Sequence, residues 1–551
     1  MKSKVKKNVN KRNAVFNTLA IVCIIMFCIA ISPVTMQNDT YYTVKIGEDI
    51  LNYGIDGEDH YSWHEDLAYE YPHWLYDVIM NFIYRIGGWE GIYISTLVLA
   101  SILGLVMYFT NVKMCKNHII PFLLTIGALY LMKSYIAARA QLVTFILFSL
   151  TVFFIERFLK NRKMGYAIGL ILISLLIANL HVAVWPFYFV LFMPAIVEYL
   201  ICVILDLDLI LRIRKLIYIV KRKIFKNKPD KLNILEEKIK KVDNQIATTR
   251  ELRAENRRHP YKIKIKRNKN VKFLILVMLI AALMGVCTPL GNTPYTYLPK
   301  TMNGNTTQNI NEHLPLTLIK QKDVLITVAV VIAILMLTDI KIRLKDLLMF
   351  GGLVVLMLMS RRQISIFALI GLTVACKILV AFCMRYKCMD DLKRLFKEMT
   401  SKYGIIITIC IFIIISVKIY KPKMDDSFVD ESSYPVQACD YILENIDLEN
   451  ARFYNEYNYG SYMLFRGIPV FIDSRADLYT PEFNPGCTVF DDFLNISNIG
   501  TYYENKFEEY DITHVICYKN AKLNMFLSRN YEYKELYSDE KFVVYERDVE
   551  E

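Results

Sequence analysis

The sequence predicts an α-helical polytopic membrane protein that carries a small α/β domain at its C-terminal end. Apolar residues make up 54% of the 551 residues and the mean hydropathy is +0.29, which is too high for an ordinary soluble protein. Apolar runs of about 17 or more residues recur, and each is long enough to cross a hydrocarbon core as a helix. From Tyr434 onward, short helix and strand patterns alternate instead.

About eleven apolar segments are expected to cross the membrane. The loops between them alternate between rich and poor in Lys and Arg, and the positive-inside rule places the rich loops in the cytoplasm. The N-terminus, a basic stretch over residues 1–13, is therefore expected on the cytoplasmic side of the membrane and the C-terminus on the outer side. The expected spans are 14–35, 89–110, 119–135, 141–157, 165–181, 183–204, 271–288, 322–338, 344–360, 363–384 and 404–420.

Two soluble parts carry opposite charge. Residues 211–270, in a basic cytoplasmic insert at 207–270, hold 21 Lys and Arg against 6 Asp and Glu, a net charge of +15. Residues 421–551, the expected extracytoplasmic α/β domain, hold 12 against 26, a net charge of −14. The overall +12 averages these two parts and does not indicate a nucleic-acid partner. A basic insert beside spans is expected to be attracted to anionic lipid headgroups.

The insert contains a helical apolar stripe formed by Leu232, Leu235, Ile239, Val242 and Ile246, which are spaced by three and four residues. The favoured interpretation is a helix that packs within the insert or lies on the membrane. A contact with a partner protein is the alternative.

The transmembrane domain, residues 14–420, includes an unusually long first outer loop at 36–88. Two helices are expected there: Thr40–Tyr53, ended by Gly54, and Pro72–Ile86, ended by Gly87 and Gly88. Pro at a helix start and Gly just past its end are the usual punctuation. In the C-terminal domain, helices are expected in YPVQACDYILENI, YGSYMLFRG and Lys522–Leu527, and strands in ARFYNE, PVFID, ITHVICY, YEYKELY and KFVVYER.

Asp39 is the first acid of the chain and follows the first apolar run directly. An ionisable group at a membrane boundary is costly unless it is solvated or paired, so it suggests a functional site. The alternative is that Asp39 caps the helix that begins at Thr40, since Asp is a good N-cap.

Other polar groups reach the same outer face from separate loops. They are Arg139, His181, Glu312, His313, Arg361 and Arg362. Arginine suits a forked contact to phosphate, which makes a lipid phosphate a candidate ligand. The alternative for any one arginine is that it extends to a lipid headgroup without a specific role.

No cofactor is expected, because the sequence has no P-loop, dinucleotide fingerprint or zinc spacing. His60 and His64 are four residues apart beside Glu65, which leaves a divalent metal as a less favoured alternative. The twelve cysteines form no spacing pattern, and most lie inside apolar runs.

Several stretches resemble the bacterial polytopic membrane proteins with a GT-C glycosyltransferase-like core. They are NDTYYTVKIGEDILNYG, DHYSWHEDLAYEYPHWLYDVI, ARAQLVTFILFSLTVFFIE, ANLHVAVW, TPLGNTPYTY, EHLPL and FYNEYNYGSYMLFRGIPVFIDSRADLY. The resemblance covers most of the chain outside the 207–270 insert. Each motif is short, but their order is specific. Related sequences often carry a second acid where this chain has Gln37, and a His where it has Thr43.

The resemblance implies a membrane glycosyltransferase that uses a polyprenyl-phosphate-linked sugar. Asp39 matches the catalytic acid and would act as general base on a cell-envelope acceptor. Arg139, Arg361 and Arg362 would bind the lipid phosphate. The expected substrate contacts are Tyr41, Tyr42, His64, His73, Trp74, His181, Glu312 and His313. The alternative is a non-catalytic membrane protein for export, ligation or scaffolding of cell-envelope polysaccharide.

Overall fold

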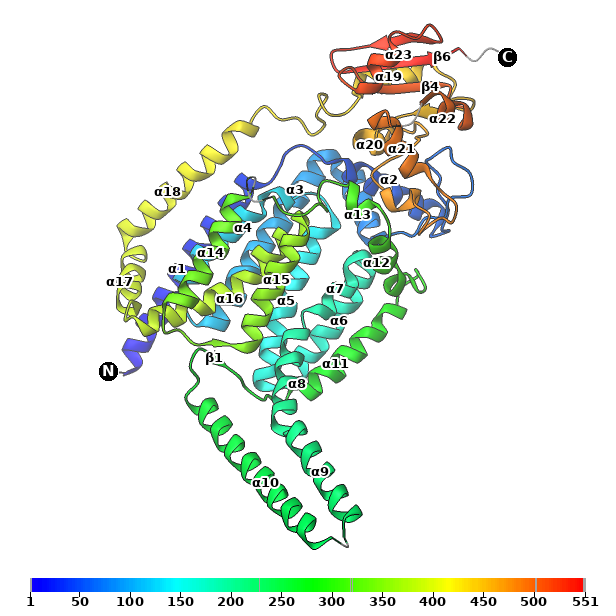
Figure 1. Ribbon diagram of the computed structural model, residues 1–551. Helices are drawn as coiled ribbons and strands as arrows, with labels where there is room; N and C mark the ends of the chain where they lie inside the picture. The colour runs from blue at the N-terminus through cyan, green and yellow to red at the C-terminus, as the bar shows by residue number, and fades with distance from the viewer. Residues whose placement is uncertain (1, 227, 318, 320, 501–502, 549–551) are drawn as a thin grey trace.

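The computed structural model describes residues 2–226, 228–317, 319, 321–500 and 503–548 (Figure 1). All eleven expected apolar segments are helical. The helices of the bundle and its insert are α1 Lys2–Ile31, α2 Asn38–Tyr53, α3 Trp74–Cys115, α4 Ile119–Met132, η1 Lys133–Tyr135, α5 Ala140–Asn161, α6 Met164–Leu180, η2 Val182–Val184, α7 Trp185–Val190, α8 Met193–Leu207, α9 Leu209–Ile224, α10 Pro229–Arg258, α11 Val271–Leu283, η3 Met284–Val286, α12 Thr293–Asn303, α13 Thr306–Asn309, α14 Lys322–Leu337, α15 Leu344–Met359, η4 Arg361–Gln363, α16 Ile364–Arg385, α17 Met389–Met399, α18 Lys402–Tyr420 and η5 Lys421–Lys423.

The long helices form one bundle around a shared apolar core, to which α1, α3–α8, α11, α14–α16 and α18 contribute buried side chains. Within the described residues, six helical stretches are long and apolar enough to cross a membrane by length and composition, and three more are shorter apolar helices. The number of eleven spans and their orientation stay predictions. Figure 1 shows the N-terminus and the α9–α10 hairpin at one end of the bundle and the C-terminal domain at the other.

The expected apolar stripe of the insert lies on α10, which packs against α9 as a helical hairpin. Leu235 and Val242 are the buried members of the stripe. The stripe therefore packs within the insert, which was the first of the two interpretations. After the hairpin, β1 (Ile263–Lys264) pairs in parallel with β2 (Ile342–Arg343) and joins the end of the insert to the start of α15.

The C-terminal domain contains a four-stranded sheet in the order β3-β4-β6-β5. The strands β3 (Phe453–Tyr454) and β4 (His514–Tyr518) are parallel, whereas β6 (Phe542–Arg547) runs antiparallel to both β4 and β5 (Tyr533–Ser538). The terminal strand pair is as expected. The helices of this domain are α19 Val436–Asn445, α20 Tyr457–Phe465, η6 Ala476–Tyr479, α21 Val489–Asn498, α22 Tyr503–Glu509 and α23 Lys522–Leu527.

The expected strand PVFID does not join the sheet, so this prediction is wrong. The segment is largely buried, and among the described residues its one β-bridge is the pairing of Val470 with Ser62 of the first outer loop. The amide of Phe471 donates to the side chain of Asn455 (2.8 Å) and the amide of Val470 donates to the carbonyl of Tyr61 (3.1 Å). In this segment, hydrogen bonds to Asn455 and Tyr61 take the place of the β-ladder that its apolar residues suggest.

The first outer loop and the C-terminal domain share a second apolar core. Tyr41 of α2 is fully buried at its centre, and its ring lies 4.9 Å from that of Tyr434, 5.1 Å from that of Tyr462 and 5.2 Å from that of Trp89. The C-terminal domain is therefore packed directly on α2 and on the start of α3.

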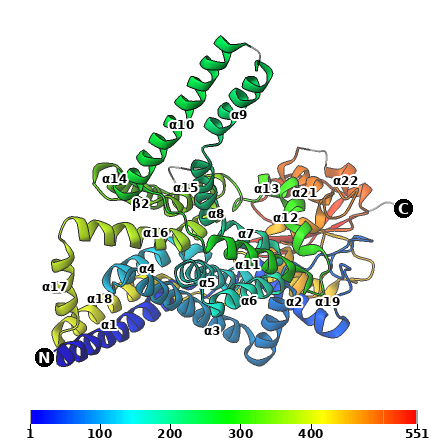
Figure 2. The ribbon, with the colours of Figure 1, turned by 90° about the horizontal axis from the view of Figure 1, so that it is seen from below.

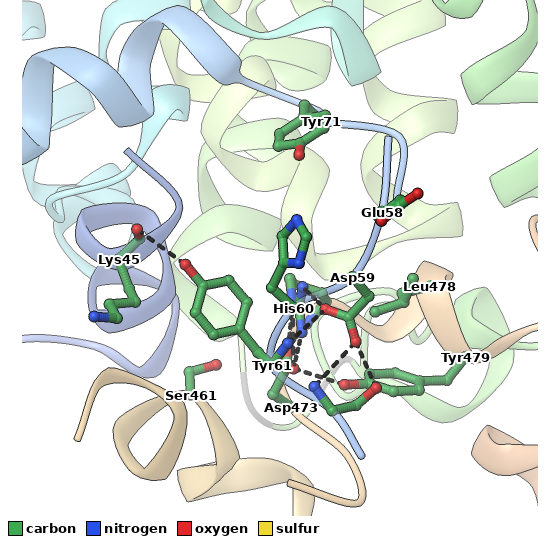
Figure 3. A network of polar contacts seen from close by, with 12 residues as sticks. Lys45, Glu58, Asp59, His60, Tyr61, Tyr71, Ser461, Asp473, Leu478 and Tyr479 are labelled. Carbon is green, nitrogen blue, oxygen red and sulfur yellow. Dashed lines mark hydrogen bonds and ion pairs between the residues drawn. The ribbon is translucent and has the colours of Figure 1, made fainter. Parts of the chain in front are cut away.

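A buried ion network adds to this contact (Figure 3). The guanidinium of Arg475 lies 2.6 Å from Asp59 of the outer loop and 2.7 Å from Asp473, and these side chains are at most 2% exposed. Tyr479 donates a further hydrogen bond to Asp473 (2.7 Å). Tyr61 of the same loop donates to the carbonyl of Lys45 on α2 (3.1 Å). The loop is thus fixed on one side to α2 and on the other to the C-terminal domain.

We expect Arg475→Met to destabilise the first outer loop and the C-terminal domain by about 3–5 kcal/mol, because it leaves the buried carboxylates of Asp59 and Asp473 without a cation. Thermal unfolding and proteolysis of the outer loop would measure the loss. Arg452→Met is the matched control. Arg452 pairs with Asp511 at the surface (3.2 Å), where an ion pair contributes about 1 kcal/mol or less. Equal losses in both variants would contradict the role given to the buried network.

Glu456, at the start of α20, predicts a pH dependence. Burial raises the pKa of its carboxyl to about 7, against about 4.3 in an unfolded chain. Between these two values the folded state holds a proton that the unfolded state releases. The stability that Glu456 contributes is therefore fully present below about pH 4.3 and is lost as the pH rises through 7. Over this pH range the wild type loses up to about 4 kcal/mol of stability through Glu456, and Glu456→Gln removes that pH dependence. We expect its melting temperature to gain on that of the wild type between pH 5 and pH 8. A constant difference would refute this origin.

Candidate functional site

Asp39 lies in the first turn of α2 and does not cap it. The helix begins at Asn38 with Gln37 as its N-cap, so the interpretation of Asp39 as the cap is wrong. Asn38 donates to the carbonyl of Tyr457 in the C-terminal domain (2.9 Å), and Thr40 donates to the carbonyl of Ala138 (3.4 Å). These contacts hold the start of α2 beside the residues that precede α5, and they direct Asp39 to Arg139.

Arg139 lies between two carboxylates. Its Nε is 3.1 Å from Oδ2 of Asp39 in an ion pair, and its Nη1 is 3.3 Å from Oε1 of Glu312. Burial disfavours the charge of the guanidinium, but Asp39 and Glu312 more than offset that cost and raise the pKa of Arg139 above its usual value. Arg139 is the N-cap residue of α5, in an extended conformation that directs it out of the helix.

Glu312 reaches the site because its loop is bound to the turn between α15 and α16. The amide of Arg362 donates to the carbonyl of Glu312 (3.0 Å), and that of Arg361 donates to the carbonyl of Leu314 (3.0 Å). Three residues far apart in the sequence, Asp39, Arg139 and Glu312, are therefore adjacent at the end of the bundle that carries the C-terminal domain (Figure 1). Their side chains remain 22–43% exposed.

An apolar cavity of about 280 Å³ opens among α5, α7, α8, α15 and α16. Aromatic and aliphatic side chains such as Phe145, Phe148, Leu191 and Leu356 form its walls. Polar groups line it as well, and they are Gln141, Thr144, His181, Arg362 and Gln363. Gln141 and Thr144 lie on the first turns of α5, the helix that Arg139 begins, so the ion cluster and the cavity are neighbours.

The two neighbouring arginines differ. Arg362 lines the cavity, and within the described part of the chain its guanidinium forms neither a hydrogen bond nor an ion pair. Arg361 does not line the cavity, and its Nε contacts the carbonyl of Pro315 (3.3 Å). The backbone carbonyl of Arg361 accepts a hydrogen bond from Tyr135 (2.6 Å). Arg362 is thus available to an anion in the cavity, whereas Arg361 is bonded to the loop that carries Glu312 and Pro315.

Two neighbouring buried hydrogen-bonded groups lie around His181 and His73. His181 contacts Thr144 (2.9 Å), and its ring lies 6.2 Å from that of His73. His73 in turn contacts Tyr42 through Nε2 (3.0 Å) and Asp77 through Nδ1 (2.5 Å). Asp77 is a residue of this region that the sequence did not predict. The four-residue spacing of His73 and Asp77 at the start of a helix was the available signal.

Other expected substrate contacts lie elsewhere. Tyr41 is buried in the core between α2 and the C-terminal domain, and Nε2 of His64 donates to the backbone carbonyl of Phe471 (2.8 Å) in the same interface. Trp74 packs at the edge of that core, at the actual start of α3, two residues later than expected. His313 follows Glu312, and burial together with Arg362 lowers its pKa to about 4, so its ring is neutral near pH 7.

The loop that carries Glu312 is also tied to the C-terminal domain. Asp477 accepts hydrogen bonds from Tyr297 (3.0 Å), Thr301 (3.0 Å) and Thr306 (3.2 Å) of α12 and α13. Burial raises the pKa of Asp477, and these three hydroxyl donors limit the rise. The C-terminal domain therefore helps to place an acid of the ion cluster.

No group of three or more His, Cys, Asp and Glu side chains is arranged to hold a metal in the described part of the chain. His60 and His64 have separate partners, because His60 contacts Asp56 (2.7 Å) and His64 contacts the backbone at Phe471.

No family model matches the sequence, and the search of curated proteins found no significant match. The structure does match solved structures of archaeal oligosaccharyltransferase. One is the Archaeoglobus fulgidus enzyme in the apo form, with a TM-score of 0.53, 10% identity, and coverage of 94% of this chain and 70% of that one. The chain has a GT-C-like fold.

Two further structures give the same result. AglB from Archaeoglobus fulgidus in complex with an inhibitory peptide and a dolichol-phosphate matches with a TM-score of 0.53 and 10% identity over 96% of this chain and 74% of that one. An oligosaccharyltransferase of the same organism, tethered to an acceptor peptide, matches with a TM-score of 0.50 and 11% identity over the same shares. At these identities the likeness concerns the fold. The GT-C-like architecture implied by the resemblance is confirmed.

Proposed function

We propose that the chain is a membrane glycosyltransferase that transfers a sugar from a polyprenyl-phosphate donor to a cell-envelope acceptor on the outer face. The observation that carries the proposal is the cluster of Asp39, Arg139 and Glu312 beside an apolar cavity whose one arginine, Arg362, is unpaired within the described residues. The GT-C-like fold supports it, and so do the dolichol-phosphate and acceptor peptide named with its structural neighbours.

In the proposed reaction, an acceptor hydroxyl attacks the anomeric carbon of the donor. Its oxygen forms the new glycosidic bond while the bond from the anomeric carbon to the phosphate oxygen breaks, and the configuration inverts. The lipid phosphate leaves with the electron pair, and Asp39 accepts the proton of the hydroxyl. No soluble nucleotide is needed, because the lipid carries the activated sugar.

The geometry divides the roles of the arginines. Arg362 faces the cavity and would bind the phosphate, with a guanidinium fork that suits two of its oxygens. Arg139 is held by two carboxylates and would position Asp39 for the acceptor. Glu312 supplies a second acid beside Arg139, although Gln37 occupies the place of the second acid in related sequences. His181, His313, Tyr42 and His73 would line or support the sugar site.

The direct test is transfer in proteoliposomes with a panel of polyprenyl-phosphate sugars and acceptors from the cell envelope. Product that depends on the lipid-linked donor supports the proposal. Specific binding of lipid-linked glycan without transfer, across the panel, would favour the export or ligation alternative.

We expect Asp39→Asn to lower the transfer rate by about 10²–10⁴, because the amide keeps the size of the side chain but accepts no proton. The purified variant should retain the melting temperature of the wild type within a few degrees. Glu58→Gln, which removes an exposed acid from the same outer loop, is the matched control and should leave the rate unchanged. Near-normal turnover in Asp39→Asn would show that Asp39 is not the general base and would make Glu312 the next candidate.

We expect Arg362→Gln to lower kcat/KM for the lipid donor by about 10–100-fold, since a charged hydrogen bond contributes about 1.5–3 kcal/mol. Arg361→Gln is the matched control on the adjacent residue. Arg361 lies outside the cavity lining, so its kcat/KM should change less than about threefold. Donor titrations with both variants would measure this difference. A larger loss in Arg361→Gln would reverse the two assignments.

A further inference from the structure

The helix α9, in the hairpin of the basic insert, exposes an unusual number of apolar side chains. None of its residues is buried, and Ile210, Leu216 and Ile224 are 78%, 61% and 68% exposed. The complete set of large, exposed apolar residues on α9 is Leu209, Ile210, Ile213, Leu216, Ile217, Val220 and Ile224.

These seven residues share one face. At about 100° per residue, they fall within an arc of about 120° on the helix surface. The opposite side of α9 is occupied by α10: Lys215 bonds Asp243 (2.6 Å), and Arg222 pairs with Glu236 (3.7 Å). Tyr218 and Ile219 are partly buried on that side. The hairpin therefore leaves uncovered the apolar face that points away from α10.

Basic residues border this face on both edges. By the same angular count, Arg212 and Lys223 follow one edge of the arc, and Arg214 and Lys221 follow the other. All four are exposed. An apolar strip between two rows of cations is the pattern of a helix that lies in a membrane interface, with its apolar side chains among the acyl chains and its cations at the headgroups.

The order of the chain also places α9 next to a candidate membrane span. It follows α8 after a single residue, Asp208, and α8 belongs to an apolar stretch that is long enough to span. Asp208 is fixed by Arg253 and by Arg250 (3.3 Å) of α10, so the hairpin leaves the bundle at a defined angle. Figures 1 and 2 show it standing clear of the bundle, at the end opposite to the C-terminal domain.

We propose that α9 binds the anionic surface of the leaflet opposite to the C-terminal domain, with Leu216 and its six apolar neighbours inserted and the four flanking cations at phosphate groups. The insert then acts as a lateral anchor that fixes the bundle to anionic lipid. The net charge of +15 over residues 211–270 adds a long-range attraction to the same surface. A protein groove or a second copy of the chain are the competing occupants.

Hydrogen exchange of the full-length protein in nanodiscs tests the proposal. We expect amides of residues 209–224 to exchange at least about tenfold more slowly in nanodiscs with about one-third phosphatidylglycerol than in phosphatidylcholine alone. Leu216→Asp should abolish this difference. Arg214→Gln combined with Lys221→Gln should reduce it several-fold, and so should high salt.

Leu252→Asp is the matched control, because Leu252 lies on α10 and is 59% exposed, nearly as much as Leu216 at 61%. It should keep the full lipid dependence. Unchanged exchange on α10 and an unchanged melting temperature would show that Leu216→Asp leaves the hairpin folded. The proposal fails if exchange of residues 209–224 is equal in both lipids. It also fails if protection depends on protein concentration or on an added protein rather than on anionic lipid.

Discussion

The position of Arg139 between Asp39 and Glu312 is the interaction on which the candidate site depends. A partly buried guanidinium is stable only if its charge is matched, and both matching carboxylates come from other outer segments. Arg139 therefore draws together the start of α2, the start of α5 and the loop after α13. The two ion pairs of Arg139 are thus the direct electrostatic contacts between these three segments beside the cavity.

The C-terminal domain completes this arrangement from outside. Tyr41 and the network around Arg475 fix it to α2 and the first outer loop, while Asp477 fixes the loop that leads to Glu312. The domain thus acts as a clamp on two of the three segments that form the ion cluster. Some of the many acids of this domain, such as Asp473 and Asp477, are therefore buried acceptors for guanidinium and hydroxyl donors and not solvated surface charges.

Local pattern predicted much of the fold. Helical periodicity and apolar run length identified the eleven long apolar segments as helices, since these signals depend on residues a few positions apart, but the shorter helices α12, α13 and α17 were not predicted. The same approach failed for PVFID, because the partners of its backbone, Asn455 and Tyr61, lie far from it in sequence. Asp39 and the arginines could be nominated from their places at loop–helix junctions. Their pairing and the difference between Arg361 and Arg362 depend on three-dimensional contacts that no spacing in the sequence encodes.

The proposed lipid-linked donor is amphiphilic, and the distribution of apolar and charged side chains in the site would favour one orientation for it. The apolar walls, formed by residues such as Phe148 and Leu356, suit a polyprenyl chain, and Arg362 is a cation that a phosphate can meet in that cavity. Asp39 and Glu312 are not among the lining residues of the cavity, and their carboxylates would repel a phosphate but not a neutral sugar or acceptor. Reversing the donor would place its phosphate against two carboxylates and its chain in water. For the proposed donor, charge and hydrophobicity would therefore favour the orientation that places the phosphate at Arg362 and the sugar toward Asp39.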